Sequence, residues 1–574
     1  MGQYGFNSTF TGAGSGAAAA PLGQDIASFM LGLVTGGNFE RNTSRTQSAN
    51  YYAFFVQDDW RAKSNLTLNF GLRYERETGT VERFNRTITG FDPNGANSVA
   101  AAARAAYAAR PFAELAANQF RGTGGVVFPT DNNRSVYNTY PLAFSPRIGF
   151  SWSPSLLGSK TAVRGGIGLF YNTFGTTGIQ QPGFNARTPV TATLDSGLTA
   201  NSTFANPFPQ GISQADGASK GLDTFLGQNI TYNNTNLAQP YIWRWSFNVQ
   251  RELGHNLIME IGYMGSRGSK LTENKDLNFI PLEFLSTSPV RDQANIDRLT
   301  RVVPNPFVGL LPNTSLNGIT TSVEQLLRPF PQFNGNGGVR IEGLTTGRSF
   351  FHMFQARFDK RFSSGFNFLA NFQYSKFIEE TNRLNAADPF LEHRIADEDR
   401  PLRLVLSSSY ELPFGKGEPF LGGANPLVSR IVGGWQLNAI YVAQSGSPLD
   451  FTDRNSIFFG GNLNLDPRQI DRAAFDTTRF ETRSAFQLDR NRRRFPTRFG
   501  NLRADGVNNL DASLIKNTQI FERLQLQIRL EMFNVLNRTQ FNGPELNPTN
   551  GNFGRVTSAA NLPRVLQLAL RFRW

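Results

Sequence analysis

Strict alternation of apolar and polar residues recurs along this chain and is clearest in its last segment, residues 564–574. One face of that segment carries Leu566, Leu568, Leu570, Phe572 and Trp574, and the other face includes two arginines and a glutamine. A period of two is typical of a β-strand whose faces meet unlike environments. A transmembrane barrel strand needs about 9 to 11 such residues, with lipid on the apolar face and water on the polar face. A soluble sheet can also contain one such strand, so this segment alone does not distinguish a soluble sheet from a transmembrane barrel. The pattern of the remaining chain is needed to distinguish them.

Further segments of the same kind precede this one and fall into pairs. We expect thirteen strands, at residues 51–60, 65–76, 144–153, 160–171, 241–251, 257–265, 350–362, 366–377, 402–412, 435–444, 510–520, 524–535 and 564–574. One or two more are expected in the first fifty residues, at about 4–10 and 38–47, with a short helix at about 25–33 between them. The sequence therefore predicts about 14–15 strands in total.

Short and long connections alternate between these segments. The long ones lie at about 77–143, 173–240, 266–349, 378–401, 446–508 and 537–563. Because alternate connections of antiparallel strands emerge on opposite sides, all the long loops share one side. Outer-membrane barrels have this asymmetry of short periplasmic turns and long extracellular loops, whereas soluble sandwiches and propellers have no reason to sort their loops.

The predicted fold is therefore all-β, an antiparallel transmembrane β-barrel of the outer-membrane type with long extracellular loops. Residues 1–50 are expected to supply the N-terminal strand or strands and a linker of the barrel, and residues 51–574 the barrel itself. Trp60, Phe572 and Trp574 are expected to insert at the membrane interface, where aromatic side chains are enriched. They all lie near the side of the short turns.

Composition excludes several classes of protein. Hydrophobic residues make up only 39% of the chain, and no run approaches the roughly 18 apolar residues that a membrane helix requires. The net charge of +13 could indicate nucleic-acid binding, but the arginines alternate with apolar residues and form no basic arm, so we expect no nucleic acid. The chain has no cysteine and only three histidines without ligand spacing, so no metal site is expected.

Several blocks of sequence resemble the barrel of TonB-dependent receptors of the Oar-like type. The longest are YYAFFVQDDW at 51–60 and LTLNFGLRYE at 66–75. The others are PRIGF at 146–150, RGGIG at 164–168, YELPFG at 410–415, GWQL at 434–437, SGSP at 445–448 and FNVLN at 533–537. The resemblance covers most of the chain from about residue 50 to Trp574.

The resemblance implies an export signal, an N-terminal carboxypeptidase-regulatory-like β-sandwich, a plug domain and a barrel of about 22 strands. The sequence shows no export signal, sandwich or plug, so we interpret the chain as the C-terminal barrel portion of a TonB-dependent receptor in the outer membrane of a Gram-negative-type bacterium. Such a receptor binds a ligand and imports it through gated passage. The implied partners are outer-membrane lipid, an unknown ligand in the outer loops, a plug domain and the TonB energy complex.

Two other functions remain open at this stage. A self-sufficient barrel of about 14 strands would act as a passive porin. A non-transporting surface protein would use its loops for adhesion or extracellular assembly. Neither an enzyme nor a cofactor is expected, because we find no nucleophile elbow and no paired-carboxylate framework. The ligand-binding residues stay unknown, since loop composition alone names no substrate.

Two charged clusters lie in predicted outer loops. The acidic group at 397–400, Asp397-Glu398-Asp399-Arg400, could hold Ca²⁺, but it lacks the glycine and spacing of a calcium loop. We expect a solvated loop held by Arg394 and Arg400 instead. The run Arg492-Arg493-Arg494 could attract an anionic ligand or lipopolysaccharide phosphates. We favour a solvated charge run there.

Overall fold

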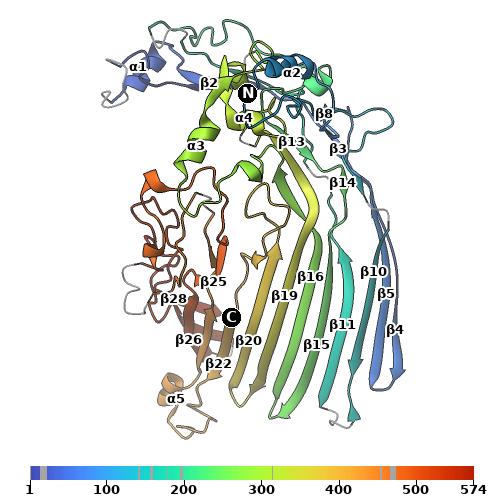
Figure 1. The fold of residues 1–574 in the computed structure, drawn as a ribbon. Helices are drawn as coiled ribbons and strands as arrows, with labels where there is room; N and C mark the ends of the chain where they lie inside the picture. Colours follow the sequence, from blue (N-terminus) through green and yellow to red (C-terminus); the bar gives the residue numbers. More distant parts are fainter. Residues whose placement is uncertain are drawn as a thin grey trace.

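The computed structural model is organised around one large, curved antiparallel sheet (Figure 1). It describes all residues except 1, 13–21, 140–141, 156–159, 176–177, 194–197, 313, 336, 453–454, 466–472 and 522. Short turns lie at the lower end of the sheet in this view, and the long connections gather above it as a cap. No helix among the described residues has the length and apolar character needed to cross a membrane.

Thirteen strands follow one another in the large sheet, each antiparallel to the next. This confirms the thirteen strands predicted from residue 51 onward. In sheet order they are β4 (Tyr51–Lys63), β5 (Leu66–Glu77), β10 (Ala143–Trp152), β11 (Thr161–Tyr171), β15 (Tyr241–Gly254), β16 (Leu257–Asp276), β19 (Val339–Ser363), β20 (Phe366–Glu380), β22 (Leu402–Glu411), β23 (Trp435–Gln444), β26 (Val507–Phe521), β27 (Leu524–Phe533) and β28 (Val565–Arg573).

The pairing register brings the predicted apolar faces together on one side of the sheet. Phe372 of β20 stands opposite Ala356 of β19 and Leu404 of β22. Leu568 of β28 stands opposite Leu530 of β27 in the same way. Since side chains alternate along a strand, every such pairing also places the intervening polar residues on the other side. The wall therefore has one continuous apolar face and one polar face.

Strands β16 and β19 extend well beyond the residues predicted for them, 257–265 and 350–362. Their added stretches, 266–276 and 339–349, pair with each other through several register shifts. These stretches are rich in Thr, Gly, Lys, Arg and Glu, and their few apolar side chains, such as Val339 and Ile341, are buried in the core of the cap. Above the membrane a strand needs no lipid-facing side, so the long alternation that marks the other strands is absent there. The long hairpin carries part of the cap.

The N-terminal strands lie outside the large sheet. β1 (Gly2–Gly5) and β2 (Gly36–Arg41) form a three-stranded sheet with β12 (Ala186–Pro189), and α1 (Gln24–Met30) lies between the first two in sequence. Residues 1–50 were expected to contribute barrel strands. At four and six residues, β1 and β2 are shorter than the roughly 9 residues that a transmembrane strand requires, and they join the cap instead.

The remaining elements are short and lie mostly in the cap. The helices are α2 (Ala100–Ala109), α3 (Gln293–Thr300), α4 (Val323–Leu327) and, in a turn at the other end, α5 (Pro426–Val432). The strands are β3 (Gln47–Ser48), β6 (Val81–Glu82), β7 (Gly90–Asp92), β8 (Gly125–Val127), β9 (Asn138–Thr139), β13 (Ile230–Asn233), β14 (Asn236–Leu237), β17 (Val302–Pro304), β18 (Thr320–Ser322), β21 (Arg394–Ile395), β24 (Pro448–Asp450) and β25 (Arg498–Arg503).

The apolar core of the molecule sits in this cap rather than in the wall. Its largest buried cluster joins α2, α3, α4 and β13 and includes Tyr107, Phe307 and Phe333. Burial in this cluster raises the pKa of Tyr232 to about 12, because apolar surroundings disfavour the charged phenolate. A second cluster is built from the loops that follow β23 and β27 and contains Phe451, among other aromatic residues. The long loops are therefore folded units with cores of their own.

The orientation of the wall predicts unequal effects of arginine at two adjacent positions near the middle of β20. Phe372→Arg places a charge on the apolar face, which costs about 2–4 kcal/mol at the centre of a bilayer. Gln373→Arg is the matched control, because its side chain belongs to the polar face. Denaturant unfolding in lipid vesicles should show a marked loss of stability for Phe372→Arg alone. Equal losses for both variants would contradict the assignment of the two faces.

Candidate functional site

The polar face of the wall carries cation–aromatic contacts between neighbouring strands and an ion pair within one strand. Phe170 of β11 lies between two arginines, with the guanidinium carbons of Arg147 and Arg244 at 4.5 and 5.7 Å from its ring centre. Nearby, Arg73 Nε pairs with Glu75 at 2.5 Å. These side chains belong to a hydrated surface, because arginine is rarely placed against lipid. The face suits the lumen of a barrel.

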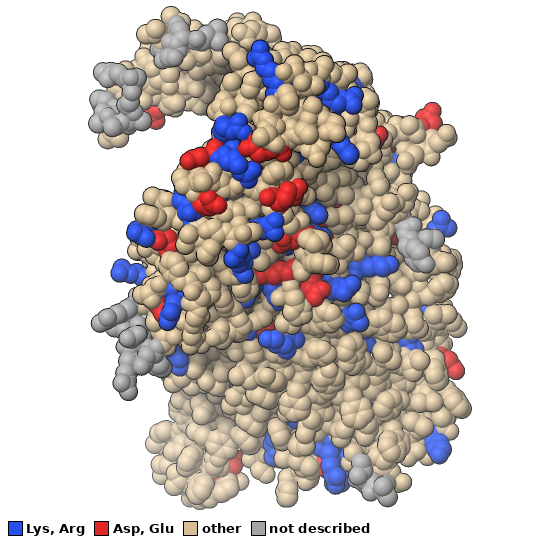
Figure 2. Space-filling model, viewed as in Figure 1, with Lys and Arg blue, Asp and Glu red and all other residues tan. Residues whose placement is uncertain are grey.

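Charged residues are concentrated in the upper half of the molecule, and few lie on the lower half of the face in view (Figure 2). An arginine–carboxylate cluster joins two outer loops to the top of β20. Arg498 contacts Asp450 at 2.7 Å and Glu379 at 2.8 Å, and Arg503 contacts Asp399 at 2.5 Å. The Asp399 side chain is fully buried. Paired buried charges of this kind hold a fixed geometry, because either partner alone would be costly to bury.

The acidic group 397–400 is therefore part of this cluster. Arg394, which was expected to hold it, pairs with Glu379 at 2.9 Å, and Arg400 donates to the backbone carbonyls of Asp397 and Asp399. The partner of buried Asp399 is Arg503, about a hundred residues away, so the prediction of a solvated loop is wrong for this residue. In the part of the chain that the structure describes, no group of three or more His, Cys, Asp or Glu could hold a metal ion.

The arginine run 492–494 is also mostly used inside the cap. Arg493 is only 3% exposed, donates to the carbonyl of Phe495 and lies with its guanidinium carbon 4.2 Å from the Phe495 ring centre. Arg492 Nε donates to the carbonyl of Leu282 at 3.0 Å. Only Arg494 of the three is exposed. The prediction of a solvated charge run is wrong for Arg492 and Arg493, because carbonyls of folded loops replace water around them.

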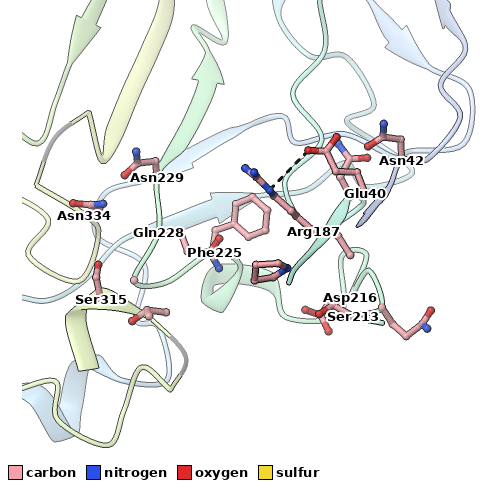
Figure 3. A pocket seen from close by; sticks show the side chains of 17 residues that line it. Glu40, Asn42, Arg187, Ser213, Asp216, Phe225, Gln228, Asn229, Ser315 and Asn334 are labelled. Atoms are coloured by element: carbon pink, nitrogen blue, oxygen red, sulfur yellow. Dashed lines mark ion pairs between the residues drawn. The ribbon is translucent and has the colours of Figure 1, made fainter. Parts of the chain in front are cut away.

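A cavity of about 900 Å³ opens in the cap, between loops that are far apart in the sequence (Figure 3). This volume is within the usual range for ligand pockets, about 300–1,000 Å³. Its lining is mostly polar and comprises Glu40, Asn42, Gly183, Asn185, Ala186, Arg187, Pro189, Ser213, Gln214, Asp216, Phe225, Gly227, Gln228, Asn229, Thr314, Ser315 and Asn334. The Arg187 Nε atom lies 3.9 Å from Glu40 across one side of the cavity.

Phe225 lies near the middle of this cavity in Figure 3 and has an unusual backbone conformation. Its φ is +60°, in the left-handed region that bulky side chains rarely adopt. Holding such a residue there costs about 1–3 kcal/mol, and residues of this kind cluster at functional sites. The Phe225 ring also packs partly against the large buried cluster, which holds it in place. The unusual conformation of Phe225 indicates that the cavity is a candidate binding site.

The three residues expected at the membrane interface are all exposed. Trp60 is 55% exposed near the end of β4, opposite Leu68, and Phe572 is 53% exposed near the end of β28, opposite Leu526. Trp574 follows β28 and is 91% exposed. All three lie toward the side of the short turns. Their insertion at the interface remains a prediction.

The cavity could not be predicted from the sequence. Its lining comes from separate loops, and no short motif links residues such as Glu40 and Asn334. The sequence contains only a weak indication of the cavity. Residues 228–236 are rich in amide side chains, with one glutamine and several asparagines. Loop geometry set by a distant apolar cluster cannot be read from such a pattern.

A family model described as an outer membrane beta barrel domain matches residues 1–567. The chain belongs to this family. Membership places it in the outer membrane of a Gram-negative bacterium. No curated protein matches the chain.

The solved structures that the chain matches include outer-membrane receptors and a transporter. The ferripyoverdine receptor of Pseudomonas aeruginosa is 10% identical, with a TM-score of 0.36, over 92% of this chain and 39% of its own. The outer membrane transporter YddB from Escherichia coli is 11% identical, with a TM-score of 0.37, over 92% and 54%. The siderophore receptor PiuA from Acinetobacter baumannii is 8% identical, with a TM-score of 0.37, over 92% and 43%. The chain thus spans about half or less of these proteins.

Removal of one carboxylate should loosen the cap of this outer-membrane barrel. Asp399→Ala leaves the guanidinium of Arg503 without its buried partner, which costs about 3–5 kcal/mol. We expect faster cleavage of loops 381–401 and 446–506 by protease added to whole cells. Asp397→Ala is the matched control, because that side chain is 64% exposed and lies 4.0 Å from Arg498. Unchanged cleavage of the Asp399→Ala variant would contradict a cap held by this cluster.

Proposed function

We propose that this chain is the C-terminal barrel part of a TonB-dependent outer-membrane receptor. The cap and the polar face of the wall bind a ligand, and passage is gated by a plug that other parts of the protein supply. The process makes and breaks no covalent bond. The main support for this proposal is that the two edge strands of the large sheet lack outer partners among the described residues.

The edge strands β4 and β28 have no partner on their outer sides among the described residues. Both faces of β4 are exposed, since adjacent Phe55 and Val56 are 69% and 68% exposed. Leu566 and Val565, which point to opposite faces of β28, are 62% and 40% exposed. Unpaired backbone groups are not tolerated in the hydrocarbon core, so a membrane barrel needs strands that cover both edges.

The directions of the two edges limit what can close the barrel. Thirteen strands joined by twelve antiparallel pairings leave β4 and β28 running the same way. An antiparallel closure therefore requires an odd number of additional spanning strands. Nine additional strands would give about 22, the size of outer-membrane transporters whose lumen is plugged. This arithmetic supports a receptor barrel of which the chain forms the larger part.

Other closures fit the geometry less well. A second copy of this chain in the same orientation would place β28 beside β4 in parallel, which barrels of this type do not use. A self-sufficient porin of 14 strands needs one more spanning strand from residues 1–50. The described strands there, β1, β2 and β3, are too short and pair outside the large sheet. The Oar-like subtype is proposed on the sequence blocks that resemble it, such as 51–60 and 66–75.

The proposal is tested on native protein extracted from outer membranes. We expect an intact mass well above 63.7 kDa, because the closing strands and the plug belong to the same receptor. In planar bilayers the plugged receptor should give no stable open-channel current.

A native mass near 63.7 kDa together with a stable current would contradict the proposal and support the passive porin. The same mass without a current, combined with lost cell–cell contact in a deletion strain, would support the adhesion protein. The mass, the current and the deletion phenotype together therefore separate all three functions that the sequence left open.

A further inference from the structure

The cap cavity offers solvent-accessible amide groups that have no partner among the described residues. The side chains of Asn42, Gln228, Asn229 and Asn334 make no hydrogen bond with any other described residue. They come from three separate parts of the chain and line the same space (Figure 3). An amide side chain presents two N–H donors and one acceptor oxygen, so the four together offer both kinds of group to a ligand.

Charge in the cavity is balanced within the protein. Arg187 lies opposite Glu40, and Asp216 pairs with Lys220 at 2.7 Å. The other lining residues are uncharged. A site for an anionic or cationic ligand would need side chains of the opposite sign without such partners. The cavity therefore favours a ligand without net charge.

An aromatic ring completes the site. Phe225 lines the cavity and packs on its other side against the buried cluster of the cap, so the ring is held rigidly. Its neighbour Gly227 also lines the cavity and has a φ of +78°, which lets the backbone turn beneath the ring. A fixed apolar ring surrounded by amides matches a ligand that has apolar C–H faces and polar edges.

We propose that this cavity binds a neutral polyhydroxylated ligand of the oligosaccharide type. Hydroxyl groups donate and accept hydrogen bonds, as the free amides do, and the C–H face of a sugar ring fits against Phe225. This inference rests on the proposed function, since it specifies the ligand class of the outer cap. It assigns Asn229 and Asn334 to hydrogen bonding and Phe225 to ring contact.

The test is direct binding by the detergent-solubilised native protein. The probe is an array of immobilised glycans, both neutral ones and ones that carry uronic acids. We expect the protein to bind neutral glycans and to bind the corresponding glycans that carry uronic acids much more weakly. The strongest neutral glycan is then titrated by calorimetry against variants.

Three variants decide the role of the cavity. Asn229→Leu removes the amide at similar size and should weaken binding about 2- to 10-fold, the range for a lost hydrogen bond. Phe225→Gly removes the ring but accepts the left-handed backbone, and should weaken binding roughly tenfold. Asn94→Leu is the control, because Asn94 is exposed in the same cap and does not line the cavity. An unchanged protease pattern shows that each variant is folded.

The inference is overturned if no neutral glycan binds, if the uronic-acid glycans bind as tightly, or if both cavity variants bind like the control. Failure of the proposed import is distinguishable from these results, because binding is measured without transport. A native protein that binds neutral glycans but has a mass near 63.7 kDa and conducts freely would contradict the receptor proposal alone.

Discussion

Pairing of backbone amide and carbonyl groups in lipid is the constraint on which this structure depends. A strand in the hydrocarbon core has no water to bond, so every inner strand of the wall pairs on both sides. That requirement produces the long antiparallel ladder from β4 to β28 and the strict alternation of its side chains. It also makes the two outer edges the most informative feature of the chain. Their common direction determines that whatever closes the barrel contributes an odd number of strands.

The same constraint explains why the wall could be predicted from the sequence. Lipid on one side and water on the other force a period of two, and the predicted Trp435–Gln444 strand is reproduced residue for residue. The prediction fell short where the constraint ends. Above the membrane β16 and β19 continue without a lipid-facing apolar side, and the N-terminal strands join the cap. Burial in the cap depends on contacts between loops that are distant in the sequence, and a local sequence pattern does not predict such contacts.

The charged loop residues show this limit most clearly. Asp399 and Arg493 stand in polar, exposed-looking segments, yet both are almost completely buried. Their partners, Arg503 and the carbonyl of Phe451, come from sequence positions that no local window contains. Burying an ion pair costs desolvation free energy, and the attraction between the two charges offsets that cost only when their geometry is fixed. In this cap they define how the loops dock, while two aromatic clusters supply the apolar burial.

The cap and the wall thus have different roles. The wall satisfies the membrane and leaves a polar inner face, whereas the folded loops create a cavity whose free amides and fixed Phe225 ring suit recognition. The strain at Phe225 is compatible with this division, because the surrounding core holds its backbone in place. Recognition and closure can accordingly be tested separately.

Amide hydrogen exchange on the native protein in outer membranes tests the central claim most directly. Half of the amides of an edge strand point away from its partner, and in β4 and β28 these have no acceptor among the described residues. If additional strands close the barrel, these amides should exchange as slowly as those of the interior strand β20. Fast exchange of the outward amides of both edge strands, alongside protected β20, would show that the edges stay open and would contradict the account.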